Sequence, residues 1–250
     1  MNKIGFIIQA RSGSSRLPGK MTKLFFNDLT IPEILISNLQ NSFPEIPIVL
    51  ATTTNPIDDK FCKNIESTGI EVYRGSENDV LKRFVDTAVH YGYQKIVRIC
   101  ADNPFLNMEF IADLLNSWTD TMDYLTHRIN KKPSMKTGLG FFTELTTLDA
   151  LQRVMKYTSE NFYHEHVTNY IYEHKEKFSV NWIDAPTVLT RNDFIRLTVD
   201  TEQDFTNAQL IFKKLYTGSL RIDYTDIVSF VSNHPDLINN MLSETAKNKK

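Results

Sequence analysis

The segment 4–20, IGFIIQARSGSSRLPGK, decides the fold. Its first five residues, Ile4 to Ile8, form a continuous apolar run, which is typical of a strand buried on both faces of a parallel sheet. The remainder, from Gln9 to Lys20, is polar and rich in glycine and serine. Ligands of open α/β sheets bind at the carboxyl ends of the strands. The segment therefore predicts a ligand-binding loop at the edge of an α/β sheet.

Strands and helices alternate through the next hundred residues. The predicted strands are short apolar runs, and in the predicted helices apolar residues recur every three to four positions. This alternation predicts an α/β fold, a three-layer sandwich in which helices cover both faces of a mostly parallel mixed sheet. After 4–8, the predicted strands are 48–51, 72–73 and 95–100, and the predicted helices are 31–42, 58–68, 80–91 and one around 110–115.

The rhythm changes near residue 127. Residues 127–138 are basic and polar, which favours a mobile loop. We expect a single domain over 1–240, with 127–190 as a smaller inserted β/α subdomain or dimerisation arm, and a disordered tail over 241–250. The elements predicted in this half are a strand starting at 141–142, helices 147–157 and 161–174, strands 178–183 and 196–199, and helices 202–215 and 224–232.

Composition excludes several classes of protein. The chain has 250 residues with 41% hydrophobic residues, enough to bury a core without disulfides or a structural metal. Its net charge of −2 excludes nucleic-acid binding through overall charge. Cys62 and Cys100 are too few for a disulfide framework. The sequence contains no apolar run of the roughly 18–20 residues that a membrane helix needs. We therefore expect a cytoplasmic protein that binds neither membrane nor nucleic acid.

Three cations lie within the loop that follows the first strand. They are Arg11, Arg16 and Lys20, interleaved with Gly and Ser residues. Arginine matches phosphate oxygens with two parallel hydrogen bonds, and lysine acts as a point charge. Small residues let main-chain N–H groups approach a phosphate. The sequence therefore predicts a polyphosphate ligand, and we call residues 9–20 the phosphate loop.

The spacing within the phosphate loop excludes two common nucleotide motifs. A Walker A loop needs four residues between its glycines and Ser or Thr after the lysine, whereas five residues separate Gly13 from Gly19 and Met21 follows Lys20. The dinucleotide-binding G-x-G-x-x-G pattern is also absent from the sequence. A P-loop ATPase and a nicotinamide-type enzyme are therefore not supported.

The stretch IIQARSGSSRLPGK (7–20) closely resembles the opening of the sugar cytidylyltransferases, the superfamily of acylneuraminate and ketodeoxyoctonate cytidylyltransferases. Within that superfamily it is most similar to the group like the spore-coat polysaccharide biosynthesis protein F. Five further segments match in order along the chain, which makes chance an inadequate explanation. They are ATTTNPIDD (51–59), YRGSENDVLKRF (73–84), VRICADNPF (97–105), HEHVTNYIY (164–172) and RLTVDTEQDF (196–205).

The resemblance implies a fold like that of glycosyltransferases of the A type and a homodimer. It implies transfer of CMP from CTP to a sugar hydroxyl with release of pyrophosphate, for surface polysaccharide. Lys20, Arg11 and Asp102 would be catalytic. The implied nucleotide contacts are Ala10, Arg11, Ser12, Gly13, Ser14, Arg16 and Lys20 in the phosphate loop, with Ala51, Thr52, Thr53, Arg74, Gly75, Ser76 and Asp79 after the next two strands.

Two acids are the candidate metal ligands. Asp102 and Asp200 each follow a predicted strand, so both side chains can reach one sheet edge. In the family that this chain resembles, the matching acids bind Mg²⁺, which prefers hard oxygen ligands. Turn or helix-capping roles are the alternatives for both, and Asp204 fits a first-turn helix acid better than a ligand.

The acceptor side carries weaker signals. The resemblance places Glu165 and His166 near the acceptor pocket. His164 and His166 are two residues apart, which is not a zinc-binding spacing on a helix. Gly140 stands where relatives carry an acid, so the acceptor itself is open. A nonulosonic or keto-sugar acid gripped by the basic 127–138 segment is one candidate, and a merely solvated loop is the alternative.

Other functions stay open on the sequence. A nucleotidyltransferase of the same fold could use another nucleotide or a phosphorylated acceptor that is not a sugar. A catalytically silent nucleotide-binding protein is a second alternative. A glycosyltransferase of this fold usually carries a D-x-D pair, whereas the segment 101–104, ADNP, has one acid.

Overall fold

The computed structural model describes residues 3–247. Within them, eight strands form one mixed sheet and two more form a small ribbon. The sheet strands are β1 (Ile4–Gln9), β4 (Ile48–Thr53), β5 (Glu71–Gly75), β6 (Lys95–Cys100), β7 (Tyr124–Ile129), β8 (Lys132–Pro133), β9 (Glu144–Thr147) and β10 (Val180–Asp184). The ribbon pairs β2 (Leu24–Phe26) with β3 (Leu29–Thr30).

The strand order is β10-β7-β9-β6-β1-β4-β5, with β8 paired to β7. Strands β6, β1, β4 and β5 run parallel, and β9 enters antiparallel between β6 and β7. The parallel strands β1, β4 and β6 therefore end together, at Gln9, Thr53 and Cys100. We call this the catalytic edge of the sheet, because it carries the motifs discussed below.

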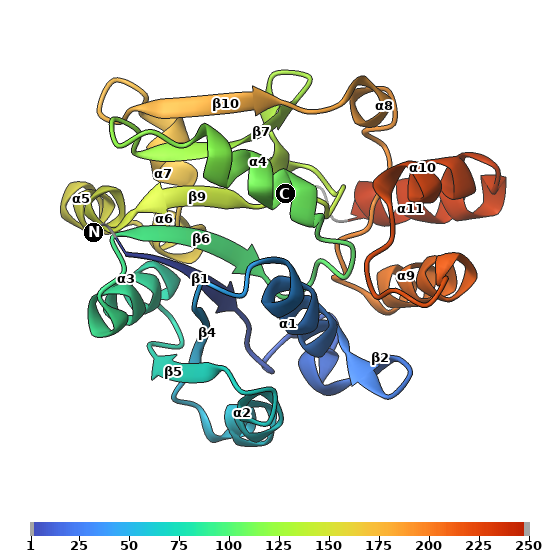
Figure 1. Cartoon of the computed structure of the whole chain (residues 1–250), viewed down its shortest axis with the longest axis horizontal. Coiled ribbons are helices and arrows are strands. Elements are labelled where there is room, and N and C mark those ends of the chain that lie inside the picture. Colours follow the sequence, from blue (N-terminus) through green and yellow to red (C-terminus); the bar gives the residue numbers. More distant parts are fainter. Residues whose placement is uncertain (1–2, 248–250) are drawn as a thin grey trace.

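Helices cover both faces of the sheet, which confirms the predicted three-layer α/β sandwich (Figure 1). One face carries α1 (Ile31–Ser42), α4 (Met108–Ser117), α9 (Glu202–Leu215), α10 (Tyr224–Ser232) and α11 (Pro235–Lys247). The other carries α3 (Val80–Tyr91), α5 (Leu148–Tyr157), α6 (Asn161–Glu165) and α7 (Asn169–Glu173). The remaining helical elements are α2 (Asp59–Glu66), α8 (Thr187–Thr190) and the short 3₁₀ turns η1 (Lys20–Thr22), η2 (Pro56–Asp58) and η3 (Ser134–Lys136).

The two cores follow from the two-residue period of the strands. In β1, Phe6 and Ile8 face the core under α1, whereas Ile7 faces the core under α3. All three side chains are fully buried. Each such residue stabilises the fold by about 1.5–3 kcal/mol relative to an exposed one. The apolar run at the start of the chain thus fixes both layers of helices.

Local signals placed several elements at their predicted bounds. Helix α1 begins and ends as predicted, with Thr30 and Glu33 forming a capping box at its start. Asp79 accepts a hydrogen bond from the Lys82 amide and caps α3. Gly92 ends α3 at φ 72°, a left-handed conformation that favours glycine.

The predicted mobile loop at 127–138 was wrong. Residues up to Ile129 continue β7, which turns back as β8. The turn uses Asn130 and Lys131, both with positive φ (48° and 68°). Two such residues form the hairpin turn whose twist matches that of paired strands. A polar composition therefore concealed a hairpin.

Two other elements differ from the prediction. The predicted helix 161–174 is split into α6 and α7, because Val167 and Thr168 turn inward and are buried. The predicted strand 196–199 is extended but joins no sheet. Its amides bond to loops instead, with Leu197 donating to the Gly138 carbonyl and Val199 to the Asp102 carbonyl. The strand expected from 141–142 begins later, at β9.

The segment 127–190, predicted as an inserted subdomain, adds β8, β9 and β10 to the main sheet and α5 to α7 to one face. The tail predicted to be disordered over 241–250 is helical through Lys247 as part of α11, and 248–250 lie outside the described residues. Met241 is fully buried there, which gives the helix a core contact. Across residues 3–247, no helix combines the length and apolarity required to cross a membrane.

Candidate active site

The phosphate loop is folded upon itself beyond the end of β1. The Ser14 amide donates to the Ser12 carbonyl (2.8 Å), and the Leu17 amide donates to the Ser14 hydroxyl (3.2 Å). Ala10 and Ser12 are buried, whereas Arg11 and Gly13 are exposed. The loop thus has buried residues at its base, and it exposes two cations, Arg11 and Arg16, together with Gly13 at the catalytic edge.

Asp58 anchors this loop, and the sequence analysis missed it. Its Oδ1 accepts from the Ser12 amide at 2.6 Å, and its Oδ2 accepts from the hydroxyls of Thr52 (3.1 Å) and Thr53. Burial acts to raise the pKa of Asp58, but hydrogen bonds from Thr53, Ser12 and Thr52 outweigh it and hold the pKa below its ordinary value. Asp58 is therefore a buried carboxylate that ties the phosphate loop to β4.

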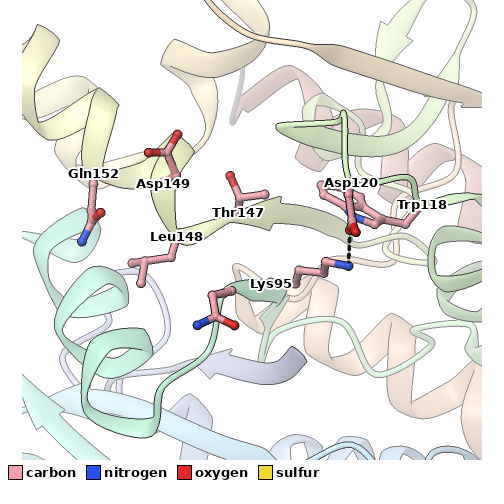
Figure 2. Close-up of a pocket in the computed structure, with 8 residues that line it drawn as sticks. Lys95, Trp118, Asp120, Thr147, Leu148, Asp149 and Gln152 are labelled. Carbon is pink, nitrogen blue, oxygen red and sulfur yellow. Dashed lines mark ion pairs between the residues drawn. The ribbon is translucent and has the colours of Figure 1, made fainter. Parts of the chain in front are cut away.

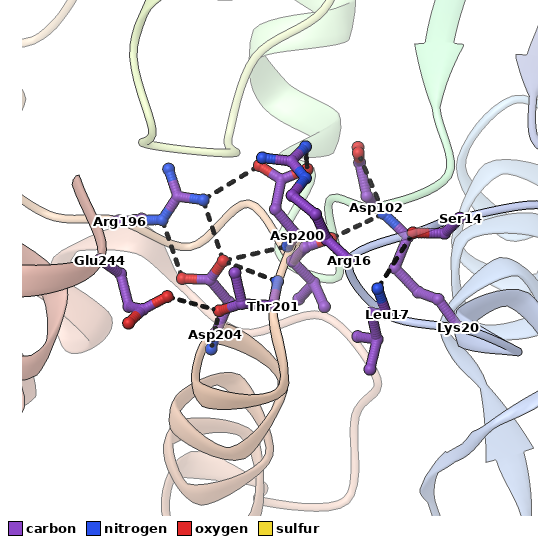
Figure 3. Close-up of polar contacts among 11 residues, drawn as sticks. Ser14, Arg16, Leu17, Lys20, Asp102, Arg196, Asp200, Thr201, Asp204 and Glu244 are labelled. Atoms are coloured by element: carbon purple, nitrogen blue, oxygen red, sulfur yellow. Dashed lines mark hydrogen bonds and ion pairs between the residues drawn. The ribbon is translucent and has the colours of Figure 1, made fainter. Parts of the chain in front are cut away.

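Two phosphate-loop cations meet the two candidate metal acids (Figure 3). Lys20, only 7% exposed, donates to the Val199 carbonyl (2.7 Å) and lies 3.4 Å from the Asp102 carboxylate. Arg16 donates to Oδ1 of Asp200 at 2.9 Å. The structure thus brings together four predicted residues from three distant segments. Each cation lies beside one of the acids, so positive and negative charges offset one another at this edge.

Arg196 and Asp204 complete the shell around Asp200. Arg196 donates to Oδ2 of Asp200 (3.0 Å) and to both oxygens of Asp204 (2.8 and 2.9 Å). Asp204 also accepts from the amides of Asp200 and Thr201, both at 3.0 Å. Burial acts to lower the pKa of Arg196, but Asp204 and Asp200 outweigh it and raise the pKa. Asp204 is thus a first-turn helix acid, as predicted, and it also fixes the Asp200 backbone.

The residues predicted after β4 use their side chains to hold the loops. Ala51, Thr52 and Thr53 are buried, and both hydroxyls are engaged by Asp58. Arg74 donates to the carbonyls of Thr53 (2.9 Å) and Asn55 (2.8 Å) and pairs with Asp59. The side chains of Thr52, Thr53 and Arg74 therefore hold the loops next to the catalytic edge through hydrogen bonds.

The residues predicted after β5 follow the same pattern. The Ser76 hydroxyl accepts from the Asp79 amide at 3.0 Å, and Asp79 caps α3. A Cβ on Gly75 would approach the Arg83 side chain to 3.1 Å. Arg83 is fully buried beneath this turn, and burial, reinforced by Arg11, lowers its pKa to about 10. The side chains of Ser76 and Asp79 therefore hold this turn and the start of α3.

The predicted acceptor residues lie at the end of α6. Glu165 is exposed, and the ring of half-buried His166 contacts that of Phe162. The preceding His164 bridges two elements, with Nδ1 2.8 Å from the Asp79 carboxylate and Nε2 3.0 Å from the Thr158 carbonyl. Both partners are acceptors, so the doubly protonated ring satisfies both contacts. Burial acts to lower the pKa of His164, but Thr158 and Asp79 outweigh it and raise the pKa.

Gly140, the position where relatives carry an acid, has a structural requirement of its own. Its φ is 68°, and a Cβ there would lie 3.2 Å from the backbones of Leu197 and Thr198. A side chain would therefore push the 196–199 segment away from Asp102 and Asp200. Arg98, left open between a structural and a substrate role, pairs with buried Glu144 and also donates to Gln9.

Two cavities lie away from these motifs. One of about 320 Å³ is lined by Lys95, Trp118, Asp120 and Leu148 among others (Figure 2). Lys95 begins β6 and lies about 17 Å from the catalytic edge, since a strand rises about 3.3 Å per residue. The other, about 280 Å³, lies between the 104–109 and 219–223 segments. Neither of these two cavities is lined by residues of the phosphate loop.

Comparisons with known proteins agree with this geometry. A model of the cytidylyltransferase family matches residues 5–228. An uncharacterised protein of Methanocaldococcus jannaschii is 37% identical over 95% of this chain and 93% of its own length. The spore coat polysaccharide biosynthesis protein SpsF of Bacillus subtilis is 29% identical over 94% of this chain and 97% of its own length.

Solved structures agree as well. A cytidylyltransferase from Leptospira borgpetersenii superposes with a TM-score of 0.84 at 28% identity, covering 96% of this chain and 98% of that one. A CMP:2-keto-3-deoxy-manno-octonic acid synthetase complexed with CTP shares the fold, with a TM-score of 0.62 at 11% identity, covering 85% of this chain and 99% of that one. The chain belongs to the cytidylyltransferase family and is a CTP-dependent nucleotidyltransferase.

Proposed function

We propose that this enzyme transfers CMP from CTP to the hydroxyl of a sugar, with Mg²⁺ as cofactor and pyrophosphate as the second product. The observation that carries the proposal is the pairing of Lys20 with Asp102 and of Arg16 with Asp200 at the catalytic edge. Transfer of a phosphoryl-type group requires mainly positioning and charge neutralisation, and this edge supplies both signs of charge within one site.

The donor set fits Mg²⁺. Among residues 3–247, no group of three or more His, Cys, Asp or Glu side chains could hold a metal ion, so the protein would supply fewer than three such ligands. Asp102 and Asp200 are two carboxylates on backbones joined by the bond from the Val199 amide to the Asp102 carbonyl (2.9 Å). Mg²⁺ is commonly held by one or two carboxylates together with substrate phosphates and water. Asp102 and Asp200 would hold the ion, which supplies charge neutralisation at the phosphates and polarises them toward attack.

The chain's own residues would share the remaining work. Exposed Gly13 would let the main chain of the phosphate loop approach the triphosphate, and Asp58 would fix the loop through the Ser12 amide. Arg11, Arg16 and Lys20 neutralise the charge that grows on the leaving pyrophosphate. The sugar hydroxyl oxygen forms a bond to the α-phosphorus and gives its proton to water, while the bond from the α-phosphorus to the bridging oxygen of the leaving pyrophosphate breaks.

A sugar is the acceptor class that the relatives favour, because one is named for polysaccharide biosynthesis. A role in making surface polysaccharide is proposed on the same ground. In the basic 127–138 segment, Arg128 and Lys136 are paired with Asp184 and Glu173, whereas Lys131 and Lys132 are exposed, so the segment does not by itself select an acidic acceptor. The homodimer and the cytoplasmic location remain predictions, which light scattering and cell fractionation would check.

The test begins with thermal-shift measurements on CTP, UTP, ATP, GTP and dTTP, each with and without Mg²⁺. A ligand at 100 times its dissociation constant adds about 2.7 kcal/mol, or about 5–10 °C for a chain of this size. We expect a shift that is selective for CTP and larger with Mg²⁺. Release of pyrophosphate is then measured across a panel of neutral and acidic sugars. A shift by another nucleotide instead of CTP, or no pyrophosphate release with any sugar, would contradict the proposal.

A further inference from the structure

The last helix of the described chain, α11, carries a buried acid. Leu237, Met241 and Glu244 lie four and three residues apart, so they share one face of the helix. All three are buried, and Glu244 is only 5% exposed. This face packs against α9 and α10 at one end of the molecule (Figure 1). A buried carboxylate is costly unless it is paired or hydrogen-bonded, so the acid on this apolar face requires a partner.

One of the partners of Glu244 is Thr201, the residue that follows Asp200. The Thr201 hydroxyl donates to Oε2 of Glu244 at 2.7 Å, and Lys247 donates to Oε1 at 2.8 Å. The same hydroxyl accepts from the Asp204 amide at 3.2 Å and so caps α9. A hydroxyl has one proton to give. Because that proton goes to Glu244, a lone pair of the Thr201 hydroxyl oxygen is available to accept the hydrogen bond from the Asp204 amide.

Asp204, whose amide is held by Thr201, in turn fixes the position of Asp200. It accepts from the Asp200 amide and clamps Arg196, which in turn holds Oδ2 of Asp200 (Figure 3). The charge of Glu244 strengthens the hydrogen bond from Thr201, because a bond to an ionised acceptor is stronger than one to a neutral acceptor. Glu244 therefore acts on the orientation of the Asp200 carboxylate through hydrogen bonds alone.

We propose that Glu244 is a positioning residue for Asp200, acting through Thr201, Asp204 and Arg196. The inference rests on the proposed function, because it takes Asp200 as a ligand of the nucleotide-bound Mg²⁺. The family match ends at residue 228, so the helix that supplies Glu244 lies beyond the part of the chain that the match covers. The active site of this chain is therefore completed by a segment outside the matched region.

The test compares Glu244→Gln with Met241→Ala. Glu244→Gln removes the charge and keeps the size, whereas Met241→Ala weakens the packing of α11 and leaves the contact with Thr201 in place. For each variant, titration calorimetry gives the dissociation constant of CTP with and without Mg²⁺, and thermal unfolding gives the stability of the free protein. Turnover is measured across Mg²⁺ concentrations at saturating CTP.

We expect Glu244→Gln to raise the Mg²⁺ concentration for half-maximal turnover about fivefold or more. It should also reduce the gain in CTP affinity on adding Mg²⁺ by a similar factor, with metal-free CTP binding within twofold of wild type. Met241→Ala should lower the unfolding temperature and change neither ratio by more than twofold. Thr201→Val should reproduce Glu244→Gln, and Thr201→Ser, which keeps the hydroxyl, should resemble wild type.

The outcomes separate this inference from the proposed function. If wild type shows neither CTP turnover nor tighter CTP binding with Mg²⁺, the proposed function fails. If wild type shows both and Glu244→Gln matches it, the positioning role of Glu244 fails alone. Equal changes in Glu244→Gln and Met241→Ala would likewise overturn it, because the effect would then follow the stability of α11.

Discussion

Replacing Asp58 by asparagine should destabilise the protein and disorder the phosphate loop together. The carboxylate accepts from one amide and two hydroxyls, and hydrogen bonds to a charged group contribute about 1.5–3 kcal/mol each. The amide side chain keeps one acceptor oxygen and turns an NH₂ group toward the remaining donors. The two hydroxyls recover part of the loss by rotating. We therefore expect a loss of about 3 kcal/mol, or about 6–12 °C in unfolding temperature.

The neighbouring acid provides the control. Asp59 pairs with Arg74 at the surface, where its side chain is 54% exposed. Exposed ion pairs contribute about 0–1 kcal/mol, so Asp59→Asn should change the stability by no more than that. Urea unfolding at pH 7 measures both variants, and titration with CTP reports the loop. Equal stability of the two variants, or full CTP affinity in Asp58→Asn, would refute the anchoring role.

The pH dependence of this difference supplies a second check. The folded-state pKa of Asp58 is lowered, so its contribution is present above the unfolded pKa of about 4 and is lost as the pH falls through the folded value. The stability difference between wild type and Asp58→Asn should be constant from pH 8 to about pH 5. It should shrink below about pH 4, as the wild-type carboxyl takes up its proton. A difference that instead grows with acid would contradict the assigned hydrogen bonds.

Three further predictions concern other parts of the site. Lys20→Ala and Asp102→Asn should each lower turnover at least about 100-fold, since each removes charge stabilisation near the triphosphate; near-normal turnover with an unchanged circular-dichroism spectrum would contradict this. The pKa of His164 is raised in the folded protein, so protonated His164 stabilises the fold fully below about pH 6.5, its unfolded pKa. This contribution is lost as the pH rises through the folded-state pKa. The unfolding temperature of wild type should therefore fall toward that of His164→Gln between pH 6 and 9, and a constant gap would argue against a protonated His164. Gly140→Ala should cost about 1–3 kcal/mol through its left-handed backbone and its contact with Leu197 and Thr198, measured by urea unfolding; an unchanged stability would mean that the 196–199 segment yields freely.

The sequence was most informative where the signal is local. The apolar run of β1, the cap and length of α1 and the glycine after α3 are each set by residues within a few positions of one another. The turn at Asn130 and Lys131 is equally local, yet its basic composition resembled that of a loop. Between α6 and α7, the buried Thr168 donates a hydrogen bond to Glu144, a residue far from it in the sequence. Periodicity alone does not register such a contact.

The same division holds for the site. The cations and acids of the catalytic edge were predicted to lie close together, and the structure brings them together. Arg16, Lys20 and Asp102 follow parallel strands, whose ends meet at one edge, whereas Asp200 follows the extended 196–199 segment, which joins no sheet. The roles of Asp58 and Glu244 were missed, since an acid near a helix end fits an ordinary surface role equally well. A structural acid differs from a surface acid in being buried and in having a hydrogen-bond partner elsewhere in the chain. Thr52 and Thr53 show the converse, because hydroxyls expected at the ligand are used to bind Asp58.

The distance along the chain between the partners has a consequence for how the enzyme is made. The bond from Ser12 to Asp58 joins residues 46 positions apart, whereas Arg16 reaches Asp200 across 184 positions and Lys20 reaches Val199 across 179. At about 5–20 residues per second, a ribosome adds the second set of partners roughly 10–40 s after the phosphate loop. Asp102, the acid beside Lys20, is made part-way through that interval, whereas Arg16 waits for Asp200 until its end. The pair of acids proposed to hold Mg²⁺ is therefore complete only late in synthesis, after the ribosome has added Asp200.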